Sequence, residues 1–328
     1  MLPSLHPVRQ VTVQTGSRLH FGLIRAGKAR FRFGGLGIMI ESPKLSITAR
    51  HSDNWIGNGA LGDRAIEFAK EFCRKTSLAL AQNRGIEIHV TSAPPPHSGL
   101  GSGTQLTLAA AASIYALAGT PLPSPRQLAL ETGRGQRSAI GCHGFYQGGL
   151  LFEGGKQEKE PLSELQCRVD FPLEWRFVLI RPKTLGGVAG LSESRYFESA
   201  PMEDEAHAQE MIRLAREVII PAAFESRFDD FSEALFRYGW LAGEAFVFAQ
   251  GDVFSHPETR ERVEDLRKRG VQGVGQSSWG PTVFALVPSP EVANELVRKI
   301  ADSTLYQECE IWISAARNRG AEIIASSK

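Results

Sequence analysis

"PPPHSGLGSGTQLTLAAAASIYALAG" occupies Pro94–Gly119 and decides how the chain folds. After the prolines, Gly99, Gly101 and Gly103 alternate with small residues, and an alanine-rich helix is predicted up to about Ala118. The first N–H groups of a helix are unpaired and carry partial positive charge, and glycine lets an anion approach them closely. The stretch therefore predicts a phosphate-binding loop that leads into a buried helix.

Hydroxyl groups accompany these glycines. Ser98, Ser102 and Thr104 are candidates to bind phosphate oxygens, and Ser102 is also a candidate magnesium ligand. The loop lacks the Gly-Lys-Ser/Thr of a Walker loop, and its glycine spacing differs from a dinucleotide-binding fingerprint. The loop alone leaves open which phosphate compound is bound and whether phosphate is transferred.

Composition narrows the class of protein. Lys plus Arg number 37 and Asp plus Glu number 36, so the net charge of +1 gives no reason to expect nucleic acid or an acidic membrane as partner. The four cysteines form no C-x-x-C pair, which argues against a zinc site and fits a reducing compartment. No apolar run reaches the length of a membrane span, and the first residues do not form a signal peptide. We expect a cytoplasmic protein.

Two domains are expected from the 328 residues. Strand-like and helix-like segments are interspersed in both halves without the strict alternation of a doubly wound sheet, which predicts an α+β fold. The polar stretch "GGKQEKEPLSELQ" separates the halves. The predicted domains are therefore residues 1–160, which contain the glycine loop, and residues 161–328.

Three stretches resemble the signatures of the GHMP kinase superfamily, in the same order along the chain. Pro95–Ser102 matches the pattern P-x-x-x-G-L-G-S, Thr15–Ile24 ("TGSRLHFGLI") is similar to the N-terminal element, and Gly273–Leu286 ("GVGQSSWGPTVFAL") is similar to the C-terminal glycine-rich element. The resemblance implies an N-terminal α+β domain, a C-terminal ferredoxin-like domain, and an active site between them.

Departures from the kinase pattern indicate one branch of that superfamily. Gly141 stands where the kinases carry an Asp, Gly103 replaces the second Ser of the central signature, and Gln276–Trp279 replaces a mostly glycine run. With these features "SRLHFGLI", "GLGSGTQL", "GRGQRSAIGCHGF" and "GVGQSSWGPTVFAL" resemble the β-ribofuranosylaminobenzene 5′-phosphate synthases.

This resemblance implies a decarboxylating C-ribosyl transfer. Phosphoribosyl pyrophosphate and 4-aminobenzoate, or 4-hydroxybenzoate, would give a C-riboside 5′-phosphate, carbon dioxide and pyrophosphate in tetrahydromethanopterin biosynthesis. It further implies Mg²⁺ without an organic cofactor, and a homodimer. The alternative that stays open is an ATP-dependent small-molecule kinase of the same fold; a non-catalytic phospholigand sensor is a third reading.

Such a polyanionic substrate requires a locally basic site in a nearly neutral protein. Arg18, Arg134 and Arg137 stand beside signature glycines, and a basic loop spans Arg25–Arg32. Trp279 is a candidate to stack on the aryl ring. The full substrate-binding prediction comprises Arg18, Ser98, Gly99, Gly101, Ser102, Gly103, Thr104, Arg134, Arg137, Gln276, Ser277, Ser278 and Trp279.

Displacement at the anomeric carbon requires no protein nucleophile. A base near the para substituent of the aryl acid would assist by taking a proton as the ring donates electrons. The candidates for this base, or for a magnesium ligand, are His20, Glu193 and Glu244. Glu193 lies in "GLSESRYF", a polar segment that could act as a lid.

Overall fold

Two β-sheets organise the chain in the computed structural model, which describes residues 8–24, 33–76, 78, 85–157, 160–185 and 205–326. The first sheet has seven strands, with the order β11-β1-β2-β4-β3, and β5 joins β2 to β6. Its strands are β1 (Gln10–Ile24), β2 (Gly34–Ser52), β3 (Ile56–Gly59), β4 (Gly85–Ser92), β5 (Leu150–Glu153), β6 (Leu165–Val169) and β11 (Glu322–Ser326).

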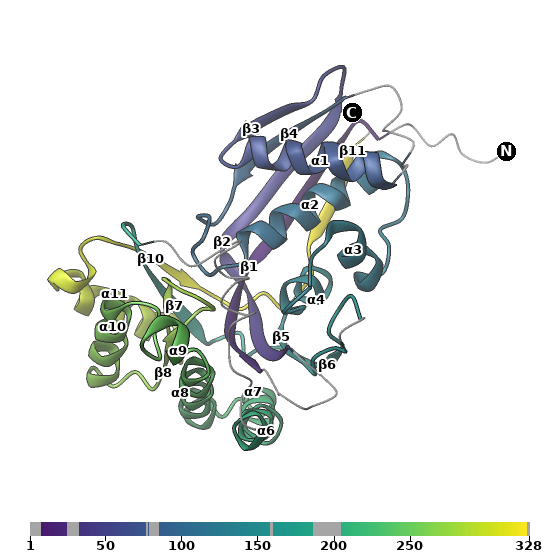
Figure 1. Ribbon diagram of the computed structural model, residues 1–328. Helices are drawn as coiled ribbons and strands as arrows, with labels where there is room; N and C mark the ends of the chain where they lie inside the picture. Colours follow the sequence, from purple (N-terminus) through teal and green to yellow (C-terminus); the bar gives the residue numbers. More distant parts are fainter. Residues whose placement is uncertain are drawn as a thin grey trace.

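Helices cover one face of this sheet (Figure 1). They are α1 (Gly62–Thr76), α2 (Ser102–Leu117), α3 (Pro125–Thr132) and α4 (Ile140–Gln147). Almost every residue of α2 is buried, as its apolar composition predicts, because α1, α3, α4 and the sheet surround it. The start of α2 is thereby held at a fixed place beside β1.

The second sheet has four antiparallel strands in the order β10-β7-β9-β8. They are β7 (Arg176–Pro182), β8 (Gly273–Gln276), β9 (Val283–Val287) and β10 (Cys309–Ser314). Helices separate β7 from β8 and β9 from β10, which is the ferredoxin-like arrangement. They are α6 (Glu205–Arg213), η2 (Leu214–Ile219), α7 (Ile220–Phe224), α8 (Phe228–Glu244), α9 (Val247–Gln250), α10 (Pro257–Lys268), α11 (Pro290–Ala301) and η3 (Thr304–Tyr306).

A shared core joins the two halves. The second part of β1 supplies Leu19 and Phe21, which are buried with Phe177 of β7 and Phe284 of β9. The Phe21 and Phe284 rings meet edge to face at 5.3 Å. A β-bulge interrupts β1 between His20 and Gly22, and bulges of this kind re-aim neighbouring side chains. One long strand therefore runs from the first half into the second.

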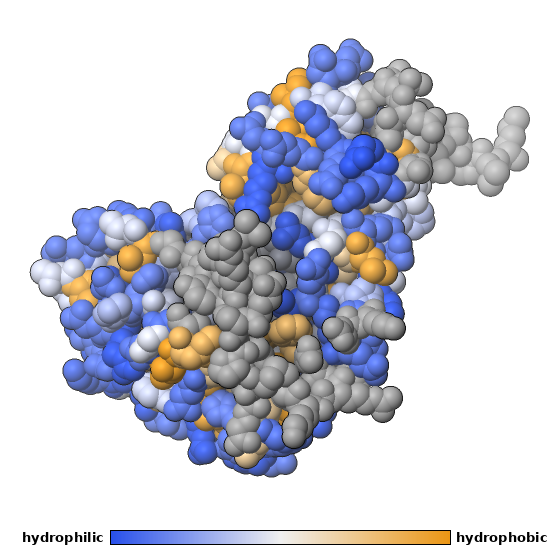
Figure 2. Space-filling view, viewed as in Figure 1, coloured by the Kyte–Doolittle hydropathy of each residue, from blue (hydrophilic) through white to orange (hydrophobic). Residues whose placement is uncertain are grey.

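The α+β fold with a ferredoxin-like second half agrees with the prediction. The boundary at residue 160 stays a prediction, but the chain crosses it twice: β6 joins the first sheet, and β11 pairs with β1. Within the described part of the chain, no helix is long and apolar enough to cross a membrane. The face seen in Figure 2 is mostly hydrophilic, and its apolar residues are scattered.

Candidate active site

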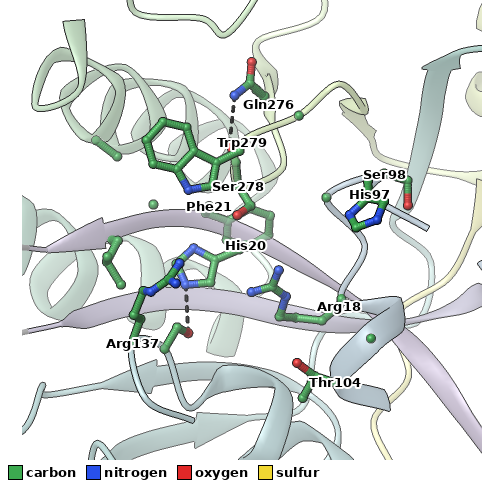
Figure 3. Close-up of a pocket in the computed structure, with 18 of the residues that line it drawn as sticks. Arg18, His20, Phe21, His97, Ser98, Thr104, Arg137, Gln276, Ser278 and Trp279 are labelled. Atoms are coloured by element: carbon green, nitrogen blue, oxygen red, sulfur yellow. Dashed lines mark hydrogen bonds between the residues drawn. The ribbon is translucent and has the colours of Figure 1, made fainter. Parts of the chain in front are cut away.

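A cavity of about 500 Å³ lies where the two halves meet. The walls come from β1, the glycine loop before α2, the segment before α4, the second half of α8, and the turn after β8 (Figure 3). A cavity of this volume accommodates a small-molecule substrate. The three signature-like stretches thus meet at one place.

The glycine loop adopts the anion-binding form that its sequence predicts. Gly99 and Gly101 have φ values of 78° and 73°, a region that favours glycine, and α2 begins at Ser102. Gly101 accepts hydrogen bonds from the N–H groups of Thr104 and Gln105. Among the described residues the N–H groups of Ser102 and Gly103 have no backbone acceptor, so the start of α2 presents donors to the cavity.

Ser277 links the three stretches to one another. Its hydroxyl donates to the Gly99 carbonyl at 2.8 Å and accepts from the His20 N–H at 3.1 Å. The N–H of Ser278 donates to the His20 carbonyl, and the N–H of Arg18 donates to the Leu100 carbonyl, both at 3.0 Å. Ser277 is fully buried and does not line the cavity, so in this structure it positions the backbone around the site and does not contact substrate.

Four arginines line the cavity. A Cβ built on Gly101 would lie 3.2 Å from Arg18 Nε, and one on Gly103 would lie 3.1 Å from Arg64 Nη2, so both guanidinium groups pack on the loop. Arg134 Nη2 donates to Thr107 of α2 at 2.8 Å. Burial, and then the charge of Arg64, lower the pKa of Arg134.

The remaining arginine, Arg137, is labelled beside His20 in Figure 3. Among the described residues that line the cavity there is no Asp or Glu. An anion placed between several guanidinium groups is attracted by all of them. The basic wall is therefore suited to a polyanion.

His20 projects from β1 into the same cavity. Its side chain is almost fully buried, and its Nε2 lies 2.9 Å from Ser138 Oγ in a hydrogen bond. Burial, together with the positive charge of Arg18, lowers the pKa of His20 well below the usual 6.5. The imidazole is therefore neutral at neutral pH and is able to accept a proton.

An apolar wall faces this polar side. Trp279 lines the cavity with 8% of its surface exposed, and its ring meets that of Phe246 at 4.8 Å, edge to face. Phe254 and Val253 extend this wall. Gln276 is fixed beside it, since its Oε1 accepts from Ser255 and its Nε2 donates to the Ser278 carbonyl at 2.8 Å. The wall is suited to an aromatic ring.

Most predicted site residues line the cavity. They are Arg18, His20, Ser98, Gly99, Gly101, Ser102, Gly103, Thr104, Arg134, Arg137, Gln276, Ser278 and Trp279. The hydroxyl of Ser98 donates a hydrogen bond within its own loop, to the Pro95 carbonyl at 2.6 Å. In this structure its hydrogen therefore points to Pro95, and phosphate binding by Ser98 stays a prediction.

Glu244 does not reach the cavity. It is exposed on α8, and its carboxylate accepts a hydrogen bond from Trp240 Nε1 at 2.8 Å. Gly239, Ala242 and Gly243 present the opposite face of α8 to the cavity. This position corrects the expectation that Glu244 acts as base or magnesium ligand. Glu193 and the basic loop Arg25–Arg32 lie outside the described residues.

The described side chains of the cavity do not provide enough ligands to bind a magnesium ion without substrate. No cluster of three His, Cys, Asp or Glu side chains occurs in the described chain, and the predicted ligand Ser102 offers one neutral hydroxyl. Magnesium in proteins usually takes one or two carboxylates together with substrate phosphates. We therefore derive no step through the ion.

Sequence reasoning missed Arg64, Ser138 and the helix face of α8. Arg64 stands in the first turn of α1, where the helix dipole disfavours a cation. This unfavourable position is the one sequence feature that indicates a functional role for Arg64. Ser138 belongs to the stretch in which Gly141 stands where the kinases carry an Asp, and no local pattern singles out its hydroxyl. A Cβ built on Gly141 would lie 3.2 Å from Thr104 Cγ2, so α2 leaves little room for an acidic side chain there.

Comparison with known proteins agrees with this geometry. Residues 63–148 match the family described as GHMP kinases N terminal domain, and residues 219–307 match GHMP kinases C terminal. The fold resembles homoserine kinase from Cytophaga hutchinsonii, with a TM-score of 0.65 at 15% identity over 99% of both chains. It also resembles mevalonate pyrophosphate decarboxylase from Streptococcus pyogenes, with a TM-score of 0.68 at 10% identity over 95% of this chain and 98% of that one. The protein has the fold of the GHMP kinase superfamily.

Relatives along the whole chain define the branch. A protein named β-ribofuranosylphenol 5′-phosphate synthase from Archaeoglobus fulgidus is 34% identical over 95% of this chain and 98% of its own length. A protein of the same name from Methanothermobacter thermautotrophicus is 28% identical over 97% of this chain and 99% of its own length. The chain belongs to the β-ribofuranosylphenol 5′-phosphate synthase family and is a pentosyltransferase-type enzyme, which confirms the resemblance found in the sequence.

Replacing Ser277 by Ala should destabilise the protein. The change removes a buried hydroxyl and leaves the Gly99 carbonyl and the His20 N–H without their partner. We expect the free energy of unfolding in urea to fall by about 2–3 kcal/mol. The matched control is Ser113→Ala, because the hydroxyl of this buried serine donates only within its own helix, to Ala110. Equal free energies of unfolding for Ser277→Ala and Ser113→Ala would contradict the role of Ser277 in holding the three stretches together.

Proposed function

We propose that the cavity binds phosphoribosyl pyrophosphate and 4-hydroxybenzoate and joins them, with loss of carbon dioxide and pyrophosphate, to give β-ribofuranosylphenol 5′-phosphate. One observation carries the proposal: the cavity has a wall of four arginines, without a described acidic residue, opposite an aromatic wall. This division matches a substrate with several phosphate charges beside an apolar ring. The product is proposed to serve tetrahydromethanopterin biosynthesis.

The basic wall supports the choice of a phosphorylated sugar. The start of α2 offers backbone N–H groups, and Arg18 and Arg64 lie over Gly101 and Gly103. Arginine binds phosphate oxygens in a bidentate manner, and a fixed cluster of donors requires little reorganisation when negative charge develops on a leaving pyrophosphate. Magnesium, which the resemblance implies, would accompany the pyrophosphate oxygens.

The aryl substrate is chosen from the names of the relatives. Three relatives at 28–34% identity are named for a ribofuranosylphenol, which favours a hydroxyl over an amino group in the para position. Trp279 and Phe246 form the wall on which the ring would pack, and the neutral His20 lies in the same cavity. His20 is proposed to take the proton of the para hydroxyl.

The proposed step balances without a protein nucleophile. The ring carbon that bears the carboxylate forms a bond to the anomeric carbon while the bond to pyrophosphate breaks, and pyrophosphate leaves with the electron pair. The para hydroxyl gives its proton to His20 as the ring becomes a dienone. The bond to the carboxylate then breaks, carbon dioxide leaves, the ring regains aromaticity, and the phenolate takes back the proton. Placement of the two substrates in line is the main contribution of the cavity.

The alternative function, an ATP-dependent kinase, has less support. A kinase of this kind positions the acceptor hydroxyl with an acidic residue, and here Gly141 is packed against Thr104 of α2. No described residue that lines the cavity is acidic.

An isotope assay tests the proposed function. Purified protein with magnesium and carboxyl-labelled 4-hydroxybenzoate should release labelled carbon dioxide only when phosphoribosyl pyrophosphate is present. A parallel reaction with 4-aminobenzoate measures the choice of substrate. Release with 4-aminobenzoate alone would overturn the choice of the phenol, and absence of release with either acid, alongside ATP consumption on an alcohol, would overturn the transferase.

Arg64 should contribute to binding of phosphoribosyl pyrophosphate. Replacement by Gln removes one guanidinium from the loop, and we expect KM for this substrate to rise about tenfold to hundredfold, the equivalent of losing one charged hydrogen-bonding group. Steady-state kinetics measure the change. The control is Arg74→Gln, an exposed arginine in the last turn of the same helix, whose KM should equal that of the wild type. Identical KM values for the two variants would remove Arg64 from the site.

A further inference from the structure

Glu153, the last residue of β5, is a buried carboxyl group that the proposed reaction does not use. Its exposed surface is 0%. Its Oε2 accepts the N–H of Ala139 at 2.6 Å, while its Oε1 is buried and has no hydrogen-bond partner among the described residues. A carboxylate left partly unsatisfied in a protein interior is costly, so its presence calls for a function.

Ser138 lies next to this carboxyl group, since the N–H of its chain neighbour Ala139 donates to Glu153. The Ser138 and Ser163 hydroxyls favour the charged form of Glu153, and Ser138 Oγ also lies 2.9 Å from His20 Nε2. Ser138 and His20 both line the cavity, whereas Glu153 does not. Glu153 therefore lies on the interior side of these two cavity residues.

The hydrogens of this chain can be assigned by counting donors and acceptors. Ser138 Oγ accepts the N–H of Ile140 at 3.3 Å and has one hydrogen to donate. If that hydrogen points to the Glu153 carboxylate, the remaining lone pair of Oγ must accept a hydrogen from His20 Nε2. His20 Nδ1 then carries the lone pair, and no hydrogen bond joins Nδ1 to another described residue.

We propose that Glu153, acting through Ser138, holds His20 in the tautomer that carries its hydrogen on Nε2 and presents Nδ1 to the cavity as a proton acceptor. Glu153 and Ser138 are positioning residues, because neither is required to touch the reacting atoms of the aryl acid. The orientation of an imidazole by a buried acid is a general device, since the group bonded to one ring nitrogen determines the state of the other. The catalytic consequence rests on the proposed function, but the tautomer does not.

Of Glu153 and the titratable groups named here around it, Glu153 is the one whose pKa lies near 7. Burial raises the pKa of Glu153 to about 7, while Arg18 on β1 acts to lower it. Cys142 of α4 has its pKa raised to about 12, mainly by burial, so it stays a neutral thiol. Lys156, after β5, has its pKa lowered by burial and raised by Glu153, and His20 has its pKa lowered. Protonation of Glu153 below about pH 7 would let it donate to Ser138 and release the tautomer.

Nitrogen NMR tests the tautomer in the intact wild-type protein, with no substrate. The chain contains 8 histidines, and comparison of ¹⁵N-histidine-labelled wild type with His20→Gln identifies the His20 signals. At pH 8 we expect Nε2 to be protonated and Nδ1 to be unprotonated, with both tautomers present in Glu153→Gln and Ser138→Ala. A protonated Nδ1 in the wild type, or a single unchanged tautomer in both variants, would overturn the proposal whatever reaction the protein catalyses.

Kinetics test the consequence for the reaction. The wild type should show an acid limb near pH 7 in kcat. Glu153→Gln should remove that limb, lower kcat about tenfold to hundredfold, and leave KM for phosphoribosyl pyrophosphate unchanged. In a Ser138→Ala background, Glu153→Gln should lower kcat by no more than about twofold, because Ser138 no longer joins Glu153 to His20. The control is Glu164→Gln, which removes an exposed charge nearby. Additive losses, or an acid limb that persists in Glu153→Gln, would contradict the proposal.

Thermal stability separates this role from a structural one. Since the pKa of Glu153 is raised from 4.5 to about 7, the folded protein binds this proton more tightly than the unfolded chain, and stability falls as pH rises through that range. Glu153→Gln carries no charge to bury, so its melting temperature at pH 8 should equal or exceed that of the wild type. A lower melting temperature with unchanged kcat would assign Glu153 to structure alone.

Discussion

The hydroxyl of Ser277 is the interaction on which the cavity depends. It holds the carbonyl of Gly99 and the N–H of His20 at once, and so fixes the glycine loop, the first strand and the turn after β8 against one another. Arg18 and His20 extend from the first strand, and Arg18 and Arg64 pack on the glycine loop. Because the hydroxyl is buried, water does not compete for either bond. The two halves of the protein are thereby joined through the site itself, and the site keeps its shape before substrate arrives.

The division of the cavity into a basic wall and an aromatic wall explains how a protein with a net charge of +1 provides a polyanion site. Guanidinium groups from α1, β1 and the segment before α4 are gathered at one end of α2, where the helix dipole adds to their field. Burial first, and then the charge of Arg64, lower the pKa of Arg134, and an anion bound beside these groups would offset both effects. The absence of described acidic residues from this wall also distinguishes it from a site that positions a hydroxyl for phosphoryl transfer.

The sequence was sufficient for the fold class, the buried helix α2, the glycine loop and three of the four arginines, since these depend on local patterns. It was not sufficient for Arg64, Ser138 or Glu153, because their proximity arises from strand pairing and helix packing between distant segments. Helical periodicity does not tell which face of α8 lines the cavity, and Glu244 lies on another face, where it accepts a hydrogen bond from Trp240. The domain boundary was drawn from a polar stretch, and a polar stretch carries no information about β11, which returns from the far end of the chain.

The pairing of β11 with β1 has a consequence for how the protein is made. During synthesis β1 emerges first, and Val13 meets its partner Ile323 only when nearly all of the described chain has been translated. Until then one edge of the strand that carries Arg18 and His20 is unpaired, and such an edge is open to pairing with other chains. The nascent protein therefore passes through a long aggregation-sensitive stage. A chain cut short before β11 would contain every described residue that lines the cavity, but its first sheet would lack an edge strand.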